Sequence, residues 1–370
     1  MAHIGIDARL PYYRDGGIST YVRRLIRALE QLDAHNDYTI FHRRGAPETL
    51  TQRFRRADLW TPAHHRLERL ALSIELAPRR LDLFHSVDFI PPYRAARVHI
   101  ITVHDLTFLH YPQYLTTESR RYYNGQIRAA VAQARHILAD SDSTRHDLIA
   151  MLNVPPEKIT VHLLGVGEQY KPLPAARIAP ILAGYGLSPS YLLHVGTWEP
   201  RKNIPALLRA YRELLLTHAD LPPLVLVGRR GWHYDDLRAE CDAIGLGKRV
   251  LWLDSVPDEH LPALYNGALL NLTVSFYEGF GLPALEGMAC GVVPIVSNRS
   301  SLPEIVGQVG LLVDPEDDAS IATAIHRGLH DNAWRAEQQA AATRRASAFT
   351  WEACARTALD VYRAALGQSA

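Results

Sequence analysis

The stretch ALLNLTVSFYEGFGLPALEGMACGVVPIV, residues 268–296, joins two short apolar runs through a loop and a helical segment. The runs ALLNLTV and VVPIV have the length and continuous apolar character of buried strands. Between them, Ser275–Leu282 has the composition of a loop, and Pro283 suits the first helical position, where its missing N–H costs nothing. Gly291 is expected to close the helix as a C-cap. The stretch therefore predicts one strand–loop–helix–strand unit of a parallel sheet.

The same alternation of strands and helices occupies the rest of the chain. In the first half, the apolar runs LDLFH, VHIITVH, HILAD and ITVHLL alternate with helical stretches. After the proline-containing stretch YKPLPAARIAP, residues 170–180, the pattern resumes with YLLHVG, PLVLVG and RVLWLD. At 370 residues the chain is too long for one ordinary core. We therefore expect an α/β fold with two Rossmann-like, doubly wound parallel-sheet domains, residues 1–172 and 173–349, facing each other across a cleft.

The composition is that of a globular protein with no biased tract. Hydrophobic residues make up 47% and charged residues 21% of the chain, and the formal net charge of +1 gives no reason to expect nucleic acid as a partner. One segment departs from this balance, because residues 43–80 hold nine arginines and four acids. This segment is either a solvated surface or a surface that contacts an anionic membrane or an anionic acceptor.

Three features favour a cytoplasmic location. Cys241, Cys290 and Cys354 show no metal-type or redox spacing, which suggests buried thiols in a reducing compartment. The N-terminus MAHIGIDARL lacks the long apolar core and cleavage site of a signal peptide. No run approaches the ~20 apolar residues of a membrane span. We therefore expect a cytoplasmic chain, with peripheral contact at the inner membrane face if the 43–80 segment binds lipid.

Two acids lie on either side of a Gly-Phe-Gly turn in the opening stretch. Glu278 falls on the loop and Glu286 in the expected first helical turn, beside the amides of Gly279, Phe280 and Gly281. Amides at a helix start bind phosphate oxygens and carboxylates accept hydrogen bonds from hydroxyls, so this combination suits a sugar ligand. The simpler interpretation, that Glu286 only favours its helix N-terminus, leaves Glu278 and the glycines unexplained.

The same glycines also fit the dinucleotide-binding pattern G-x-G-x-x-A over residues 279–284. That pattern requires an acid at the end of the following strand to hold the ribose, but VVPIV is followed by Ser297 and Asn298. A dehydrogenase is therefore disfavoured.

A second cluster, HVGTWEPRKN at residues 194–203, follows an expected strand and precedes an expected helix. It places Arg201 and Lys202 at the mouth of the cleft. The chain has four lysines against 36 arginines, so a lysine directly after an arginine indicates a required point charge. A diphosphate leaving group needs such a charge because negative charge grows on it in the transition state. The alternative is a basic helical turn exposed to water.

Together these segments resemble the retaining nucleotide-sugar glycosyltransferases of family 4, which have the GT-B fold. The resemblance covers nearly the whole chain and rests on six segments: DGG at 15–17, VHD at 103–105, GTWEPRKN at 196–203, EGFGLP with the Glu278/Glu286 pair, SNRSSLPEIVGQVGLLVDP at 297–315, and FTWEACARTALDVYRAAL at 349–366. It implies an acceptor-side first domain, a donor-binding second domain, and a C-terminal helix, residues 350–370, that crosses back to the first domain.

The resemblance also implies the site residues. The donor-binding positions are Gly16, Gly17, Gly196, Thr197, Arg201, Lys202, Glu278, Gly279, Phe280, Gly281, Leu282 and Glu286. Among them, Arg201 and Lys202 would bind the diphosphate, Glu286 the nucleotide ribose and Glu278 the transferred sugar. Thr197 stands where many members of the family have arginine.

The catalytic residues implied by the resemblance are His104, Glu278, Lys202 and Arg201. His104 would lie beside the reacting carbon and hydrogen-bond the sugar. The family is thought to react on one face of the sugar, with the leaving phosphate taking the proton of the acceptor. Asp140-Ser141-Asp142 matches the D-x-D of manganese-binding transferases of another fold, but its position before a helical stretch favours a helix cap. We therefore expect no metal and no other cofactor.

The donor and acceptor are less defined. The segments VGTWEPRKN and SNRSSLPE most resemble those of bacterial mannosyltransferases of polysaccharide assembly, which favours GDP-mannose as the donor. UDP-glucose or a deoxysugar donor are the alternatives. A saccharide or lipid-linked saccharide is the expected acceptor. Alternative classes are a sugar-nucleotide epimerase and a non-catalytic sugar-nucleotide binder. A phosphorylase would need a lysine that holds pyridoxal phosphate, and no lysine occupies a recognisable site for one.

Overall fold

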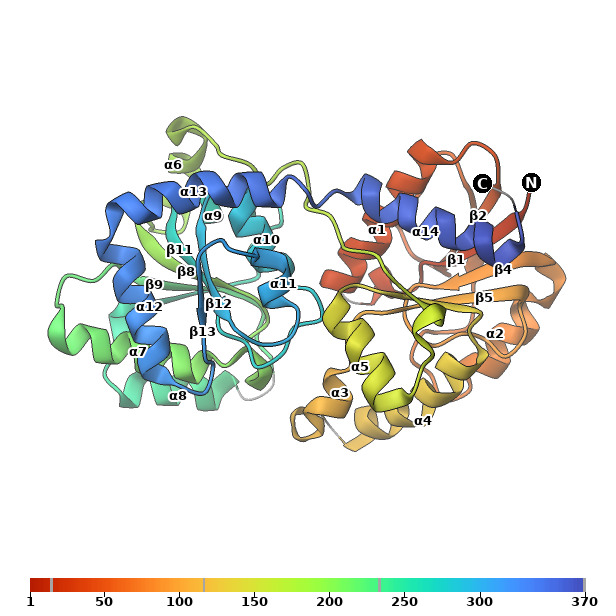
Figure 1. Ribbon diagram of the computed structural model, residues 1–370, viewed down its shortest axis with the longest axis horizontal. Coiled ribbons are helices and arrows are strands. Elements are labelled where there is room, and N and C mark those ends of the chain that lie inside the picture. The colour runs from red at the N-terminus through yellow and green to blue at the C-terminus, as the bar shows by residue number, and fades with distance from the viewer. Residues whose placement is uncertain (14–15, 116, 232–233, 369–370) are drawn as a thin grey trace. The chain divides into compact units, whose positions relative to one another are not determined.

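The chain forms two compact units, each built on its own parallel sheet, in a computed structural model that describes residues 1–13, 16–115, 117–231 and 234–368 (Figure 1). The first unit comprises Met1–Gly165 and Thr350–Ala370, and the second comprises Val166–Phe349. The predicted α/β class with two doubly wound parallel sheets is confirmed. The N-terminal segment of the first unit ends at Gly165, seven residues before the predicted boundary after residue 172.

The first sheet has seven strands in the order β3-β2-β1-β4-β5-β6-β7, with every pairing parallel. Its strands are β1 (His3–Asp7), β2 (Asp37–Arg43), β3 (Arg55–Leu59), β4 (Leu81–Ser86), β5 (Ala96–Val103), β6 (His136–Ala139) and β7 (Ile159–Val161). The helices of this unit are α1 (Gly17–Leu32), α2 (Glu68–Leu76), α3 (Thr107–His110), α4 (Thr117–Gln133), α5 (Asp142–Leu152) and α14 (Trp351–Leu366).

The second sheet has six parallel strands in the order β10-β9-β8-β11-β12-β13. Its strands are β8 (Tyr191–Val195), β9 (Leu224–Gly228), β10 (Val250–Asp254), β11 (Ala268–Thr273), β12 (Val293–Ser297) and β13 (Leu311–Val313). The helices are α6 (Ala175–Gly184), α7 (Ile204–Thr217), α8 (Tyr234–Ala243), α9 (Leu261–Gly267), α10 (Leu282–Ala289), α11 (Leu302–Val306), α12 (Asp318–His330) and α13 (Asn332–Ala346).

The strand order of the second sheet decides where a ligand can bind. The chain builds outward from β8 in one direction, then returns to place β11 on the other side of β8. Ligands of doubly wound sheets bind at the carboxyl ends of the two strands where the order reverses. Here those ends lead into residues 196–203 and 274–281, which are the two segments that the sequence analysis singled out.

Both faces of the second sheet are buried, which explains why its strands are apolar throughout. Along β9, Leu224 and Leu226 face one core, and Val225 and Val227 face the other. The first of these cores includes α7 and α12, which pack against each other. A strand covered on both sides keeps no polar alternation, so the continuous runs indicated this parallel sheet correctly.

Helix α10, from the opening stretch, differs slightly from its prediction. It begins at Leu282, after Gly281 in a left-handed conformation (φ +105°), so Pro283 is its second residue. The helix ends at Ala289, Cys290 is the C-cap, and Gly291 (φ +79°) follows. Glu286 consequently lies in the second turn, where the positive end of a helix has less effect than in the first.

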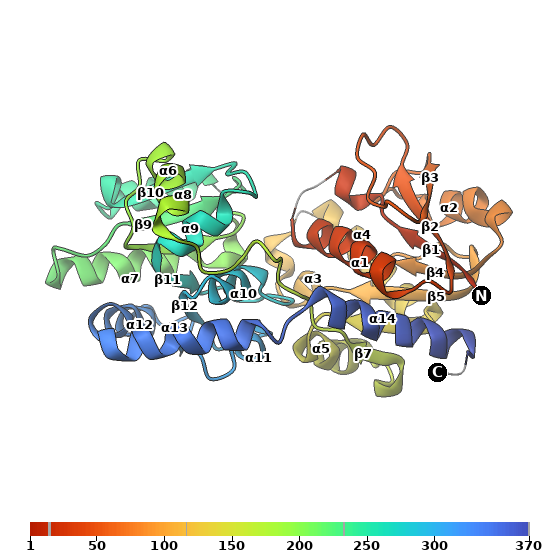
Figure 2. The same cartoon turned by 90° about the horizontal axis from the view of Figure 1, so that it is seen from above.

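The final helix, α14, belongs to the first unit, as the resemblance implied. Thr350 caps its start by accepting a hydrogen bond from the amide of Ala353. The helix packs along α1 (Figure 2), and the Tyr362 hydroxyl lies 2.6 Å from Nδ1 of buried His85. Within the described residues, no helix combines the length and the apolar character that a membrane span requires.

Candidate active site

Glu278 is the centre of a buried charged cluster in the second unit. It lies on the loop after β11 and is 6% exposed. Its Oε1 accepts a hydrogen bond from the Ser275 hydroxyl at 2.7 Å and pairs with Nζ of Lys202 at 2.6 Å. Its Oε2 pairs with Nη1 of Arg201 at 2.9 Å. Burial alone would raise the pKa of Glu278, but the Lys202 and Arg201 charges outweigh it and lower the pKa to about 2.

The two cations come from the loop after β8. Lys202 is 6% exposed, and burial together with the Arg201 charge lowers the pKa of its ammonium group despite the nearby Glu278. Arg201 also pairs through Nε with Glu199 at 2.7 Å and donates to the carbonyl of Tyr277 at 3.0 Å. A basic turn exposed to water is therefore the wrong interpretation for Lys202. The carboxylates of Glu199 and Glu278 thus balance the positive charges of Arg201 and Lys202.

Asn203 fixes the loops that carry this cluster. Its backbone has the left-handed φ of +56°, and its Nδ2 donates to the carbonyls of Val274 at 3.2 Å and Pro315 at 2.6 Å. The amide of Phe276 donates to the carbonyl of Arg201. One buried side chain thus connects the segments that follow β8, β11 and β13.

Two serines hold the other end of the Glu278 loop. The Ser300 hydroxyl accepts from the amide of Glu278 at 2.9 Å, and the Ser301 hydroxyl lies 2.9 and 2.8 Å from the carbonyls of Glu278 and Phe280. Both serines belong to the SNRSSLPE segment, and no role was predicted for them from the sequence. The position of these serines in the sequence does not indicate that they contact the Glu278 loop, so the contact is visible only in the folded structure.

Glu286 has different surroundings from Glu278. Its Oε2 accepts a hydrogen bond from the Tyr265 hydroxyl at 2.9 Å. Burial, and then the Glu286 charge, raise the pKa of both Tyr265 and Tyr170, whose rings meet edge to face. The two acids thus occupy distinct settings, one among cations and the other among phenols. Neither tyrosine was predicted from the sequence, because neither lies near Glu286 in the chain.

Two glycines of the second unit lie so close to neighbouring atoms that a side chain would not fit. A Cβ on Gly281 would lie 2.7 Å from Cδ2 of Leu302, and the left-handed φ of this residue also favours glycine. A Cβ on Gly228, at the end of β9, would lie 1.9 Å from the carbonyl oxygen of Gly196. Gly196 and Thr197 are partly exposed in the turn that this contact shapes.

His104 lies at the end of β5 in the first unit, with both ring nitrogens engaged. Nδ1 lies 2.7 Å from Oδ2 of Asp140, and Nε2 lies 2.8 Å from the carbonyl oxygen of Val87. Burial opposes a charge on this ring, but Asp140 outweighs it and raises the pKa of His104 to about 9. The ring is therefore an imidazolium at neutral pH, donating to both partners.

The D-x-D segment has two separate structural roles. Asp140 is buried against His104, and Ser141 caps α5 by accepting from the amide of Thr144 at 3.1 Å. The helix-cap interpretation therefore holds for Ser141. At the other glycine motif of this unit, Gly16 precedes α1 and Gly17 begins it, both exposed, while Asp15 lies outside the described residues.

A second buried charged network, missed by the sequence analysis, lies after β1 in the first unit. The Arg9 guanidinium pairs with Asp7 at 2.6 Å and with Glu68 at 2.7 Å, and it is 1% exposed. The Tyr122 hydroxyl donates to Glu68 at 2.8 Å, and His64 pairs with Asp88 at 2.9 Å. β1 and β4 are where the first sheet reverses its strand order, so this network lies at the ligand-binding edge of that sheet.

Comparison with known proteins agrees with this arrangement. The family described as Glycosyltransferase Family 4 matches residues 15–169, and the family Glycosyl transferases group 1 matches residues 186–346. The chain belongs to family 4 of the glycosyltransferases and is an enzyme of the GT-B fold. It is 35% identical to O-antigen chain mannosyltransferase B of Escherichia coli over 94% of this chain and 96% of that protein.

Two further similarities are more partial. A serotype-specific mannosyltransferase of Escherichia coli, WbdA, is 29% identical over 73% of this chain, which spans only 34% of that protein. Sucrose-phosphate synthase from Thermosynechococcus elongatus has a TM-score of 0.80 with full coverage of both chains at 24% identity, which shows the shared fold.

Proposed function

We propose that this glycosyltransferase moves a hexose, mannose from GDP-mannose, to a saccharide or lipid-linked saccharide during the synthesis of a cell-surface polysaccharide. The similarity to a mannosyltransferase of O-antigen chains over nearly the full length of both proteins supports the sugar and the pathway. The observation that carries the proposal is the buried Glu278–Lys202–Arg201 cluster, because it lies where a doubly wound sheet binds its ligand.

In this proposal the cluster exchanges partners when the donor binds. The diphosphate competes for Arg201 and Lys202, which in the structure neutralise Glu278. Glu278 then accepts hydrogen bonds from hydroxyls of the transferred sugar, and Glu286 accepts from the ribose. Asn203 and the amide of Phe276 fix the backbone of the loop that carries both cations, so the exchange involves side chains and not the loop itself.

The proposed reaction proceeds on one face of the sugar. The bond between the anomeric carbon and the phosphate oxygen breaks, and the acceptor oxygen forms its bond to that carbon from the same side. The departing phosphate takes the acceptor proton, while Arg201 and Lys202 stabilise its growing negative charge. In this scheme Glu278 and Glu286 accept hydrogen bonds from donor hydroxyls, so neither acts as a covalent nucleophile.

We further propose that this chemistry needs no metal. Asp140 and Ser141 of the D-x-D segment are engaged by His104 and by the start of α5, which supports assigning them structural roles. His104, as an imidazolium, would add a positive charge beside the donor. It can hydrogen-bond the sugar once Nε2 exchanges the Val87 carbonyl for a hydroxyl.

The first experiment is a calorimetric and thermal-shift comparison of GDP, UDP and ADP with their common sugars, with and without EDTA. We expect selective binding of GDP and GDP-mannose that EDTA does not change. A preference for UDP would keep the enzyme class but overturn the donor. Product analysis with the preferred donor then separates transfer from epimerisation or binding without turnover, and absence of any sugar transfer would contradict the proposed reaction.

A lipid-linked acceptor would require the enzyme to contact a membrane, and α2 has a surface suited to that contact. We propose that α2 and its flanks contact an anionic bilayer, because Leu67, Leu70 and Ile74 form an exposed stripe at helical spacing. Exposed arginines flank the stripe at positions 66, 79 and 80, and they complement anionic headgroups.

Vesicle flotation tests this contact. Leu70→Ser with Ile74→Ser, or neutralisation of Arg79 and Arg80, should reduce binding to vesicles rich in phosphatidylglycerol. Leu216→Ser is the matched control, since Leu216 is equally exposed in the second unit. Unchanged vesicle binding after both sets of substitutions would refute the contact and leave the donor site proposal untouched.

A further inference from the structure

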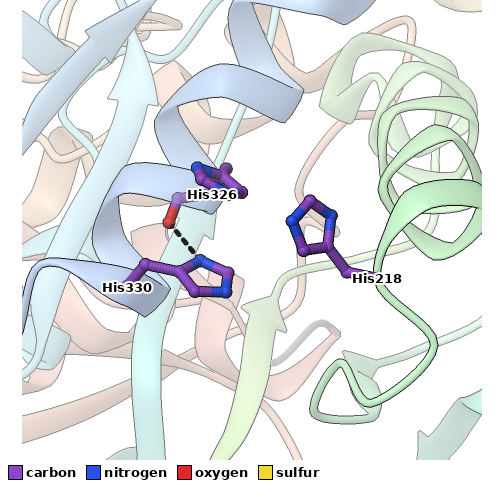
Figure 3. A group of neighbouring side chains, drawn as sticks. All are labelled: His218, His326 and His330. Carbon is purple, nitrogen blue, oxygen red and sulfur yellow. Dashed lines mark hydrogen bonds between the residues drawn. The ribbon is translucent and has the colours of Figure 1, made fainter.

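Three histidines meet at the surface of the second unit, between the ends of two packed helices. His218 is the C-cap of α7, and His326 and His330 lie one turn apart in the last part of α12. Figure 3 shows the three rings pointing toward one another from these two helices. One nitrogen from each ring lies within 4.8 Å of the corresponding nitrogens of the other two.

Hydrogen bonds orient two of these rings for a ligand. Nδ1 of His330 donates to the carbonyl oxygen of His326 at 2.9 Å, which leaves the Nε2 lone pair available. The Thr217 hydroxyl donates to the carbonyl of Leu214 at 3.2 Å, so it accepts from Nδ1 of His218 at 2.8 Å. The tautomers assigned from these bonds are those of metal-binding histidines, whose second nitrogen usually donates to an oxygen.

The donor set consists of imidazoles alone. Three imidazole ligands suit borderline metals such as zinc, nickel and copper, whereas magnesium and calcium require oxygen ligands. The stacking of His326 on His330, with centroids 4.2 Å apart, brings the two rings together but leaves the convergence of His218 unexplained.

We propose that His218, His326 and His330 bind one zinc ion that clamps the C-terminal end of α7 to that of α12. Zinc–nitrogen bonds of about 2.0–2.1 Å in a tetrahedral site place the ligand nitrogens about 3.3 Å apart. Rotation of the surface rings supplies the remaining approach. His326 also lines an open groove of about 260 Å³ with Glu213 and Thr323, which gives water access to the fourth position.

This site is separate from the donor site. Helix α7 starts next to Lys202 and Asn203 and runs for 14 residues, about 21 Å at 1.5 Å per residue, before it reaches His218. Helix α12 likewise starts after β13 and ends at His330. The histidines therefore lie at the edge of the sheet opposite to Glu278, and the bound ion has a structural role that leaves the metal-independent chemistry unchanged.

The test uses the full chain without a histidine tag, first freed of metal with EDTA that is then removed. Calorimetric titration with Zn²⁺ should show one ion per chain, and a hundredfold excess of Zn²⁺ over Kd should raise Tm by about 5 °C or more. Ni²⁺ should also bind, and Mg²⁺ should not.

Two sets of variants complete the test. His326→Gln with His330→Gln, and separately His218→Gln, should keep the metal-free Tm of the parent and weaken Zn²⁺ binding by at least tenfold. His35→Gln is the matched control, because His35 is an exposed histidine outside the cluster. Failure of the parent to bind Zn²⁺, or equal affinity in the triad variants, would overturn the proposal. Neither result bears on donor binding.

Discussion

Lys202 and Glu278 form a buried pair between two loops whose residues are 76 positions apart in the chain. Removing one partner of such a pair leaves a charge without compensation and destabilises the fold more than removing both. In the proposed reaction the same pair must also open, because the diphosphate needs the cations and the sugar needs the carboxylate. A stronger Lys202–Glu278 pair would therefore stabilise the two loops but weaken binding of the donor.

Replacing the carboxylate separates these two effects. In Glu278→Gln, the amide can still contact Ser275 but lacks the negative charge that strengthens hydrogen bonds from the sugar hydroxyls, so we expect kcat to fall about 100-fold or more. Affinity for the nucleoside diphosphate should stay equal or increase, because the cations are released for phosphate. Steady-state kinetics and calorimetry with GDP measure both. Glu337→Gln, an exposed acid in the same unit, is the control, and normal kcat in Glu278→Gln would remove this residue from the site.

His104 predicts a pH dependence of the first unit. Its pKa is raised from 6.5 to about 9, so its pairing with Asp140 stabilises the fold fully below pH 6.5 and loses this contribution as pH rises through 9. The advantage of the parent over His104→Gln in urea unfolding should shrink by about 3 kcal/mol between pH 6 and pH 10. The comparison between variants cancels the other titrating groups. An advantage that is constant with pH would show that the pKa of His104 is the same in the folded and the unfolded chain.

At the scale of elements, the sequence predicted strands better than contacts. Continuous apolar runs such as PLVLVG indicated β9 because both faces of the sheet are covered. The pairing of His104 with Asp140 was missed, although Val103 and Ala139 are neighbours in the register of β5 and β6 and place these two residues side by side. This pairing can be predicted only from the strand order and register, which local sequence patterns do not contain.

The same limit applies to the site. Arg201 and Lys202 were predicted to bind the diphosphate and Glu278 the transferred sugar, but no contact of Glu278 with the two cations was predicted. The sequence predicted Pro283 as the first residue of α10 and therefore Glu286 in its first turn. A glycine in the left-handed conformation at 281 starts the helix one residue earlier. Such a backbone choice depends on the packing of Leu302 against the loop.

Asn203 is expected to matter for the loops as a group. Asn203→Ala loses two buried hydrogen bonds and places alanine at a φ of +56°, which should lower the free energy of unfolding by about 2–3 kcal/mol. Asn203→Gly tolerates that φ and should recover about 1 kcal/mol of the loss. Urea unfolding measures the series. Asn153→Gly, at an exposed helix end with a φ of +55°, should be nearly neutral, and equal stability of Asn203→Ala and the parent would contradict the role of this residue.

At the scale of the whole molecule, the chain builds two sheets that share one strand order over six strands, and the first sheet adds a seventh. The two units differ in how the chain completes them. The second unit is one continuous segment, whereas the first needs residues 350–370 to cover α1. Trp351, Leu359 and Tyr362 are buried there, and Tyr362 reaches the buried His85. The core of the first unit is thus completed by its most distant residues.

Truncation tests this dependence. A chain that ends at Phe349 should retain a protease-resistant second unit while the first unit becomes susceptible, because the buried faces of α1 and α14 lose each other. A chain that ends at Gly367 keeps the whole helix and should behave as the parent does. Limited proteolysis with mass spectrometry distinguishes the fragments. Equal resistance of residues 1–165 in both chains would show that the first unit folds without α14.

The late position of α14 also sets an order of events during synthesis. The segment made first cannot reach its final state until residues 350–366, which are made after the whole of the second unit, have left the ribosome exit tunnel. The segment made second has all of its residues available earlier and can mature while the chain is still attached. Pulse proteolysis of stalled nascent chains should therefore find the second unit protected before the first, so that maturation runs against the direction of translation.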